Sequence, residues 1–166
     1  MRVQYPTRAF TLIELILVMA LLVAMISVTT PSLFSFFRGR ALDSEARRLL
    51  ALTHAGQSRA VSEGLPMLLW MDTERSSYGL EQETPPRDGD PKALEFSLEE
   101  GLSLEAQNTQ PVPVRGRNLP AIRFLPDGLI DESSPTVLRL GGVDNAALWL
   151  METTNHVNYE IRNTLP

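Results

Sequence analysis

The 166-residue sequence has 15 Lys and Arg against 20 Asp and Glu, a net charge of −5, and is 43% hydrophobic. This length and composition indicate one modest folded domain, and the acidic balance disfavours general nucleic-acid binding, which needs clustered basic side chains to displace counterions. The lack of cysteine excludes disulfides, thiolate nucleophiles and cysteine-ligated zinc.

An apolar stretch begins near the N-terminus and runs to Pro31. Residues 15–30 read LILVMALLVAMISVTT, and with the residues before Glu14 the stretch reaches about 20 residues, enough for a helix to cross a bilayer core of ~30 Å. A carboxylate such as Glu14 inside this stretch costs up to roughly 2.5–3.5 kcal/mol on insertion scales and usually marks function with a partner. No basic residue lies between Arg8 and Arg38 to pair with it.

The residues leading to this carboxylate resemble the processing site of type IV prepilins and type II secretion pseudopilins. Residues 8–14 read RAFTLIE and follow a short basic segment. In that family a dedicated aspartic peptidase cuts before the Phe and methylates the new amino group. The resemblance implies a leader peptide at residues 1–9, cleavage between Ala9 and Phe10, and N-methylation of Phe10. Ala9 stands where the family usually has Gly.

The same resemblance gives roles to two further residues. Glu14 falls at the fifth mature position, where the family keeps a carboxylate for assembly, and Pro31 matches its helix-kinking proline. The resemblance further implies that residues 10–31 form the transmembrane half of the helix. The protein would then cross the bacterial inner membrane once, with its C-terminal head in the periplasm. An ordinary signal peptide or simple anchor is the alternative, but no A-x-A-like cleavage site follows the apolar run.

The charges beside this apolar stretch favour the opposite orientation, with the C-terminal side in the cytoplasm. Several arginines follow it closely, and the positive-inside rule would place that side in the cytoplasm; they are Arg38, Arg40, Arg47 and Arg48. We follow the resemblance, because a long C-terminal domain can translocate despite its charges.

An amphipathic continuation of the helix is expected over residues 32–64. Apolar residues recur there at steps of three and four, which predicts one buried stripe. Gly56 weakens the helix locally, and Gly64 followed by Pro66 is a stop signal. The stripe consists of Leu42, Ala46, Leu49, Leu50, Thr53, Ala60 and Val61.

Residues 65–166 are expected to form a β-rich soluble head. Short apolar runs separated by turn-rich stretches, among them residues 111–118 and 126–128, predict antiparallel strands. Residues 81–90 (EQETPPRDGD) are expected to be an exposed, mobile loop. The pattern therefore indicates an α+β fold, with one long N-terminal helix packed on an antiparallel sheet. The resemblance to prepilins implies that this fold is pilin-like. The expected strands are Met67–Met71, Ser77–Leu80, Leu94–Leu98, Leu102–Glu105, Ala121–Leu125, Thr136–Leu140, Ala147–Met151 and Val157–Ile161.

Two features of the head resemble the H-class minor pseudopilins and their FimT-like pilus relatives. One is EARRL at residues 45–49, running on to residues 59–61 before a strand; the other is Phe124 followed by Pro-Asp-Gly at residues 126–128. Loss of Arg2 and Arg8 with the leader would leave 13 basic and 20 acidic side chains, a net charge of −7. The pilus relatives that bind DNA would be expected to have a basic surface.

No catalytic pattern is found. His54 and His156 lack a metal-ligand spacing, and no nucleophile elbow, P-loop or dinucleotide fingerprint occurs. Trp70 and Trp149 are expected in the core, and residues 115–117 (RGR) form a turn more readily than a phosphate site. A calcium site is an open alternative for five acidic residues, although we favour solvated turns; they are Asp88, Asp90, Asp127, Asp131 and Glu132. We expect no enzyme activity, no metal and no cofactor.

Two functions follow from the resemblance. The first is a minor pseudopilin at or near the tip of the pseudopilus of a type II secretion system, which helps drive protein export. Its implied partners are the prepilin peptidase/methyltransferase, other pseudopilin subunits, the membrane, and secreted cargo or the outer-membrane secretin. The alternative is a FimT-like minor pilin of a type IV pilus, in assembly or DNA uptake. The acidic charge favours the first and argues against nucleic acid as a partner.

Overall fold

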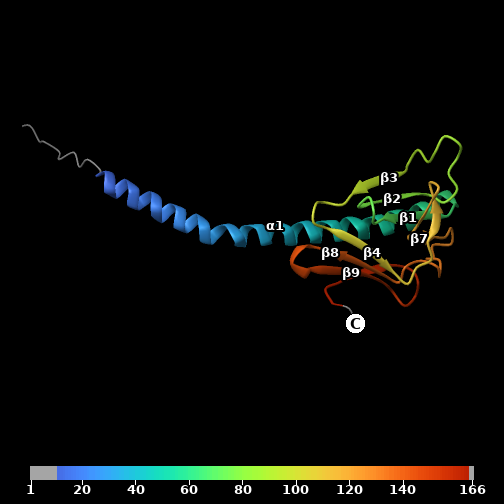
Figure 1. Ribbon diagram of the computed structural model, residues 1–166. Helices are drawn as coiled ribbons and strands as arrows, with labels where there is room; N and C mark the ends of the chain where they lie inside the picture. Colours follow the sequence, from blue (N-terminus) through green and yellow to red (C-terminus); the bar gives the residue numbers. More distant parts are fainter. Residues whose placement is uncertain (1–10, 165–166) are drawn as a thin grey trace, which may run out of the picture. The chain divides into compact units, whose positions relative to one another are not determined.

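One helix precedes all the strands. The computed structural model describes the backbone of residues 11–164 and the side chains of residues 11–26, 39–143 and 145–164. The chain divides into two compact units, Met1–Phe37 and Arg38–Pro166. The helix, α1, spans Leu12–Glu63 (Figure 1). It ends where the sequence predicts, because Gly64 adopts a φ of +66°, a left-handed conformation that suits glycine.

The strands of the second unit form two four-stranded antiparallel sheets and a separate hairpin. Sheet A has the order β3-β2-β1-β7, sheet B has the order β10-β9-β8-β4, and β5 pairs with β6. A short 3₁₀ helix, Val143–Asn145, precedes β9. The strands are β1 Met67–Asp72, β2 Ser77–Gln82, β3 Leu94–Ser97, β4 Ser103–Gln107, β5 Val112–Val114, β6 Arg117–Leu119, β7 Ala121–Phe124, β8 Val137–Gly141, β9 Ala147–Glu152 and β10 Tyr159–Arg162.

All eight expected strands are confirmed, with small shifts at their ends. The expectation of turn alone over residues 111–118 is wrong, because β5 and β6 occupy most of this stretch. Arg115 and Gly116 join the two strands, with φ values of 49° and 78°. Two successive residues with positive φ are typical of a two-residue hairpin turn, whose geometry matches the twist of the flanking strands. This turn brings β5 and β6 into register although each strand has only three residues.

The main core lies where the second unit's part of α1 meets both sheets. Figure 1 shows strands of sheets A and B along this stretch of the helix. Most of the predicted stripe is buried there, but Leu50 is half-buried and Val61 is 54% exposed. Gly56 belongs to this core, because an added Cβ would lie 2.6 Å from the Phe124 ring. The buried residues include Leu42, Ala46, Leu49, Leu52 and Ala60 of α1, Leu69 and Leu80 of sheet A, and Leu138, Leu140 and Leu150 of sheet B.

A second cluster lies on the other face of sheet A. The side chains of β1 alternate between the two faces, and all six residues are buried. Leu68 and Trp70 pack with Ala121 and with Val114 and Leu119 of the β5–β6 hairpin. The hairpin therefore covers this face of the sheet. Trp149, in contrast, is only half-buried, so the expectation of a core position is wrong for this residue.

Candidate functional site

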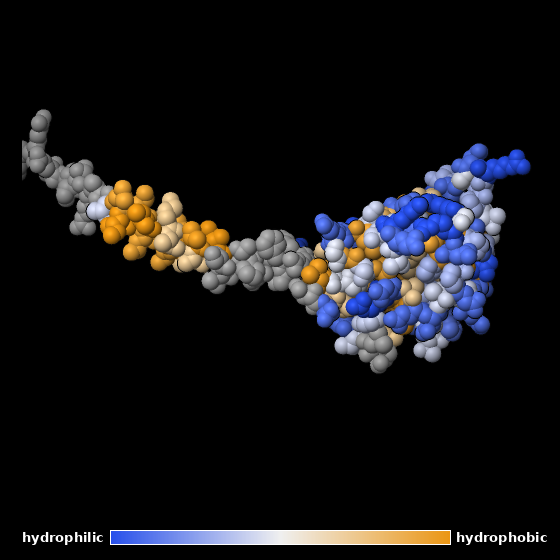
Figure 2. Space-filling model, in the orientation of Figure 1, coloured by the Kyte–Doolittle hydropathy of each residue, from blue (hydrophilic) through white to orange (hydrophobic). Residues whose placement is uncertain are grey.

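The described part of the first unit is an apolar helix with exposed side chains. Residues 11–26 are all exposed, and the large hydrophobic side chains among them range from 78% exposed for Leu12 to 45% for Val18 and Leu22. Figure 2 shows this stretch as almost entirely hydrophobic on the visible face. Among the residues that the structure describes, no helix combines the length and the hydropathy of a membrane span. So much exposed apolar surface is typical of a segment that binds lipid or other proteins.

Glu14 lies in the first turn of this helix. Its backbone N–H donates to the carbonyl oxygen of Thr11 at 3.1 Å, and its contact with the Thr11 hydroxyl oxygen is 3.4 Å. Thr followed three residues later by Glu is a helix-start pattern, and an acid in the first turn is favoured by the helix dipole. The carboxylate of Glu14 is exposed, and neither the described residues 11–26 nor the sequence up to Arg38 provides a basic side chain. Its assembly role stays a prediction.

The other residues named for processing and bending are outside the described side chains. Ala9, Phe10 and the leader at residues 1–9 lie before the described backbone, and Pro31 lies within α1 without a described side chain. Cleavage, methylation and the kink therefore stay predictions.

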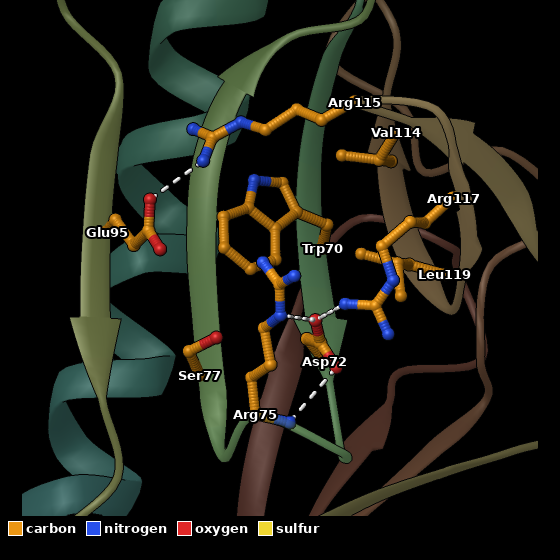
Figure 3. Close-up of a pocket in the computed structure, with 9 residues that line it drawn as sticks. All are labelled: Trp70, Asp72, Arg75, Ser77, Glu95, Val114, Arg115, Arg117 and Leu119. Atoms are coloured by element: carbon orange, nitrogen blue, oxygen red, sulfur yellow. Dashed lines mark hydrogen bonds and ion pairs between the residues drawn. The ribbon is translucent and has the colours of Figure 1, made fainter.

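A pocket of about 140 Å³ opens on the face of sheet A that the β5–β6 hairpin covers. Figure 3 shows the Trp70 indole in its centre, with Val114 and Leu119 on the hairpin side. Gly79, opposite Trp70 on β2, allows this placement, because a Cβ there would lie 2.6 Å from the indole Cζ2. The rim carries Asp72, Arg75, Ser77, Glu95, Arg115 and Arg117.

The two hairpin arginines on the rim already bind carboxylates. Arg115 bonds Glu81 at 2.9 Å from Nε and Glu95 at 2.7 Å, and its Cζ lies 5.0 Å from the centre of a Trp70 ring. Arg117 donates hydrogen bonds to the carboxylates of Asp72 and Glu74, the latter at 2.6 Å. Figure 3 draws the contact between Arg117 and Asp72. The expected turn is confirmed at Arg115 and Gly116, whereas Arg117 is the first residue of β6. Both arginines pair with carboxylates of the protein itself.

Asp72 also meets Arg75, a second cation on the rim. Its carboxylate accepts a bond from the Arg75 backbone N–H at 3.2 Å, and the Arg75 Nε lies 3.9 Å away. Burial opposes ionisation of Asp72, but the bonds from Arg75 and Arg117 lower the pKa of its carboxyl below the usual value.

A polar cluster ties the segment after β2 to α1, which corrects the expectation of a mobile loop at residues 81–90. Glu81 is buried, and the carboxylate of Asp90 is only 1% exposed. Arg59 of α1 bonds Asp90 at 3.1 Å and Glu63 at 3.2 Å. Asp90 also accepts the backbone N–H of Gln82 at 3.0 Å. Residues 84–89 between these anchors are exposed, as expected.

Two of the five acidic calcium candidates thus have protein cations as partners. Asp90 binds Arg59, and Asp131 lies 3.4 Å from Arg123, so neither is a simple solvated turn residue. Within the described residues no group of three or more potential metal ligands comes together. His156 bonds Glu152 at 2.9 Å from Nδ1, and His54 is exposed.

No protein-family model and no curated protein matches the sequence. The structure is similar to the minor pseudopilin EpsH from the Type 2 Secretion System of Vibrio cholerae, with a TM-score of 0.50 and 18% sequence identity. The match covers 78% of this chain and 97% of EpsH. The chain therefore has a pseudopilin-like α+β fold, with its helix packed on antiparallel sheets.

Proposed function

We propose that this chain is a minor pseudopilin, a structural and non-enzymatic subunit at or near the tip of a type II secretion pseudopilus. One observation carries the proposal: the helix that contributes to the head core also bears, at its other end, an exposed apolar stretch with Glu14 in its first turn. The likeness of the fold to EpsH supports it.

In this proposal the two parts of α1 have different tasks. Residues 10–31 anchor the subunit in the inner membrane before assembly and pack against other pseudopilin helices in the filament. The head lies in the periplasm and binds other subunits, cargo or the secretin. The prepilin peptidase acts first, because cleavage between Ala9 and Phe10 creates the mature N-terminus.

Intact-mass analysis of the membrane-extracted chain tests the processing step. We expect loss of residues 1–9 and the addition of one methyl group, about 14 Da, on Phe10. A chain that begins after Thr29 or Thr30 would mean an ordinary signal peptide and would refute the proposal.

Deletion of the gene in its own host tests the process served. Secretion of exported proteins should fall while type IV pili still assemble, and the intact gene should restore secretion. Loss of pili or of DNA uptake with normal secretion would instead establish the pilus alternative. The head's charges argue against that outcome, since Arg59, Arg115, Arg117 and Arg123 each pair with a carboxylate.

A further inference from the structure

Strand β3 is an outer strand of sheet A, and its side away from β2 is open. Figure 3 shows this strand, which carries Glu95, at the margin of the sheet. Immediately after β3, the N–H of Leu98 donates to the carbonyl oxygen of Ser76 at 2.8 Å, directly across the pair. Because bonded positions alternate along an antiparallel pair, the backbone N–H and C=O groups of Glu95 and Ser97 point away from β2. Among the described residues, none hydrogen-bonds these outward groups.

The apolar face of β3 is less covered than that of its neighbour β2. Leu94 is 42% exposed and Phe96 is half-buried. Their partners on β2, Leu80 and Tyr78, are both fully buried. Leu98 continues the same alternating row and is again half-buried. The core is therefore not closed at this edge, and one more strand beside β3 would cover the row.

The other outer strands do not offer the same combination. In sheet A, β7 is bonded at Arg123 by the segment that follows it, and in sheet B, β4 is bonded at Leu104 by the turn after β1. Strand β10 carries two exposed charges of opposite sign, Glu160 and Arg162, which lie 3.6 Å apart. Its edge therefore favours neither sign of charge in a partner.

The charges along β3 disfavour a second copy of the chain and favour a basic partner. Glu95, Glu99 and Glu100 lie in the strand or just after it, and all three are exposed. The nearest bases are already paired, since Lys92 bonds Glu63 and Arg115 bonds both Glu95 and Glu81. Two copies joined edge to edge would bring like charges together, which destabilises strand pairing.

We propose that the open edge of β3 binds an extended segment of a partner protein, with alternating apolar and basic residues, as a fifth strand of sheet A. Its backbone bonds the outward groups of Glu95 and Ser97, its apolar side chains cover Leu94 and Phe96, and its Lys or Arg side chains face Glu95. In such strand addition the main-chain bonds give affinity and the alternate side chains give specificity. The inference goes beyond the proposed function, because it depends on β3 alone and holds whichever filament the chain joins.

Amide hydrogen exchange of the full chain in detergent micelles tests this inference directly. The probe is the capped peptide acetyl-Lys-Val-Lys-Val-Lys-amide, and exchange is followed residue by residue by NMR. The amides of Glu95 and Ser97 should exchange about tenfold more slowly at a peptide concentration ten times the dissociation constant. The amides of β10 are the internal control and should not change.

Matched substitutions at one position then isolate the backbone bond. Ser97→Pro removes the outward N–H without removing a bond to β2, and proline is tolerated at such a position of an edge strand. It should weaken peptide binding at least about fivefold, the value of one ordinary hydrogen bond. Ser97→Ala keeps the N–H and should bind as the unchanged chain does. Exchange in the unchanged chain decides the question even if Ser97→Pro folds poorly.

Three results would overturn the proposal. The first is unchanged exchange of the Glu95 and Ser97 amides at about 10 mM peptide, well above the ~1 mM dissociation constant of a weak complex. The second is equal binding of acetyl-Lys-Pro-Lys-Pro-Lys-amide, which has the same charge but lacks two backbone donors, because attraction by charge alone would then explain the result. The third is equal or tighter binding of acetyl-Glu-Val-Glu-Val-Glu-amide, which would show that the edge does not select a basic strand.

Discussion

The hydroxyl of Tyr78 on β2 donates a hydrogen bond to the carboxylate of Glu45 on α1, and both side chains are almost fully buried. Arg48, one turn along the helix, bonds the other carboxylate oxygen at 2.9 Å. Burial, followed by the neighbouring Glu45, raises the pKa of Tyr78 well above its usual range. The hydroxyl therefore stays protonated and remains a donor at ordinary pH. This bond links the head's part of the helix to sheet A.

Removing the Tyr78 hydroxyl should lower stability more than removing a tyrosine hydroxyl that donates to an uncharged acceptor. Tyr78→Phe is expected to reduce the free energy of unfolding by about 1.5–3 kcal/mol, the range for hydrogen bonds to charged groups. Tyr159→Phe is the matched control, because the Tyr159 hydroxyl donates to the backbone carbonyl of Pro135. Its expected cost is about 1 kcal/mol. Urea unfolding of both variants measures the difference, and equal costs would mean that the charge of Glu45 adds nothing.

Asp90 should hold the segment after β2 against α1. Asp90→Asn removes the charge that binds Arg59 and is expected to lower the free energy of unfolding by about 2–3 kcal/mol. Limited proteolysis should also cut residues 83–93 faster. Asp88→Asn makes the same change on an exposed residue and should alter neither property. Equal protease resistance of the two variants would show that Asp90 does not anchor the segment.

Glu63 makes stability depend on pH in the acid range. Hydrogen bonds from Arg59, then Lys92 and Gln82, lower the pKa of its carboxyl from 4.5 to about 2. A folded-state pKa below the unfolded value gives stability that is present above pH 4.5 and is lost as the pH falls toward 2. Thermal unfolding of Glu63→Gln should therefore show a flatter loss of stability across this window.

The control for this pH effect is Glu100→Gln, which removes the same charge from an exposed turn. The two variants are compared with the unchanged chain at several pH values between 5 and 2. A slope for Glu63→Gln as steep as that for Glu100→Gln would contradict the role of the Arg59 and Lys92 bonds.

Patterns of hydrophobicity and turn residues predicted the secondary structure well. Leu69 and Leu140 lie in short apolar runs, and the period of α1 from Leu42 to Ala60 identified most of its buried face. The β5–β6 hairpin was missed because its strands have three residues each and include Pro113, which reads as loop. Such short strands gain stability from the surface they cover, which no local pattern shows.

The charged contacts of the head could not be read from the sequence in the same way. Asp90 stands in a polar stretch with two prolines, and its partner Arg59 is 31 residues away. Glu45 appears beside polar neighbours on the helix, and only the position of Tyr78 on β2 explains its burial. The pocket likewise depends on Gly79, which leaves room for an indole from the next strand. Predicting these contacts requires knowing which residues far apart in the sequence lie together, and a single sequence does not provide that information.

The last prediction is that Glu14 acts in assembly. Cleavage before Phe10 would create an amino group four residues before a carboxylate that is exposed at the start of α1. In a filament of parallel helices the Glu14 of one subunit can meet the Phe10 amine of a neighbour. Opposite charges attract more strongly in a low-dielectric surrounding, although desolvation offsets much of the gain. Pairing on docking would therefore favour the correct register.

Glu14→Gln should leave synthesis, membrane insertion and cleavage at Phe10 nearly unchanged while incorporation into the pseudopilus falls at least fivefold, about 1 kcal/mol or more of docking free energy. Asp43→Asn is the matched control, because Asp43 is an exposed acid on the same helix and pairs with Arg47 at 2.8 Å. Each variant is tested for copurification with its partner subunits and for secretion. Only Glu14→Gln is expected to be impaired. Normal copurification and normal secretion by Glu14→Gln would show that the carboxylate merely reaches the lipid interface.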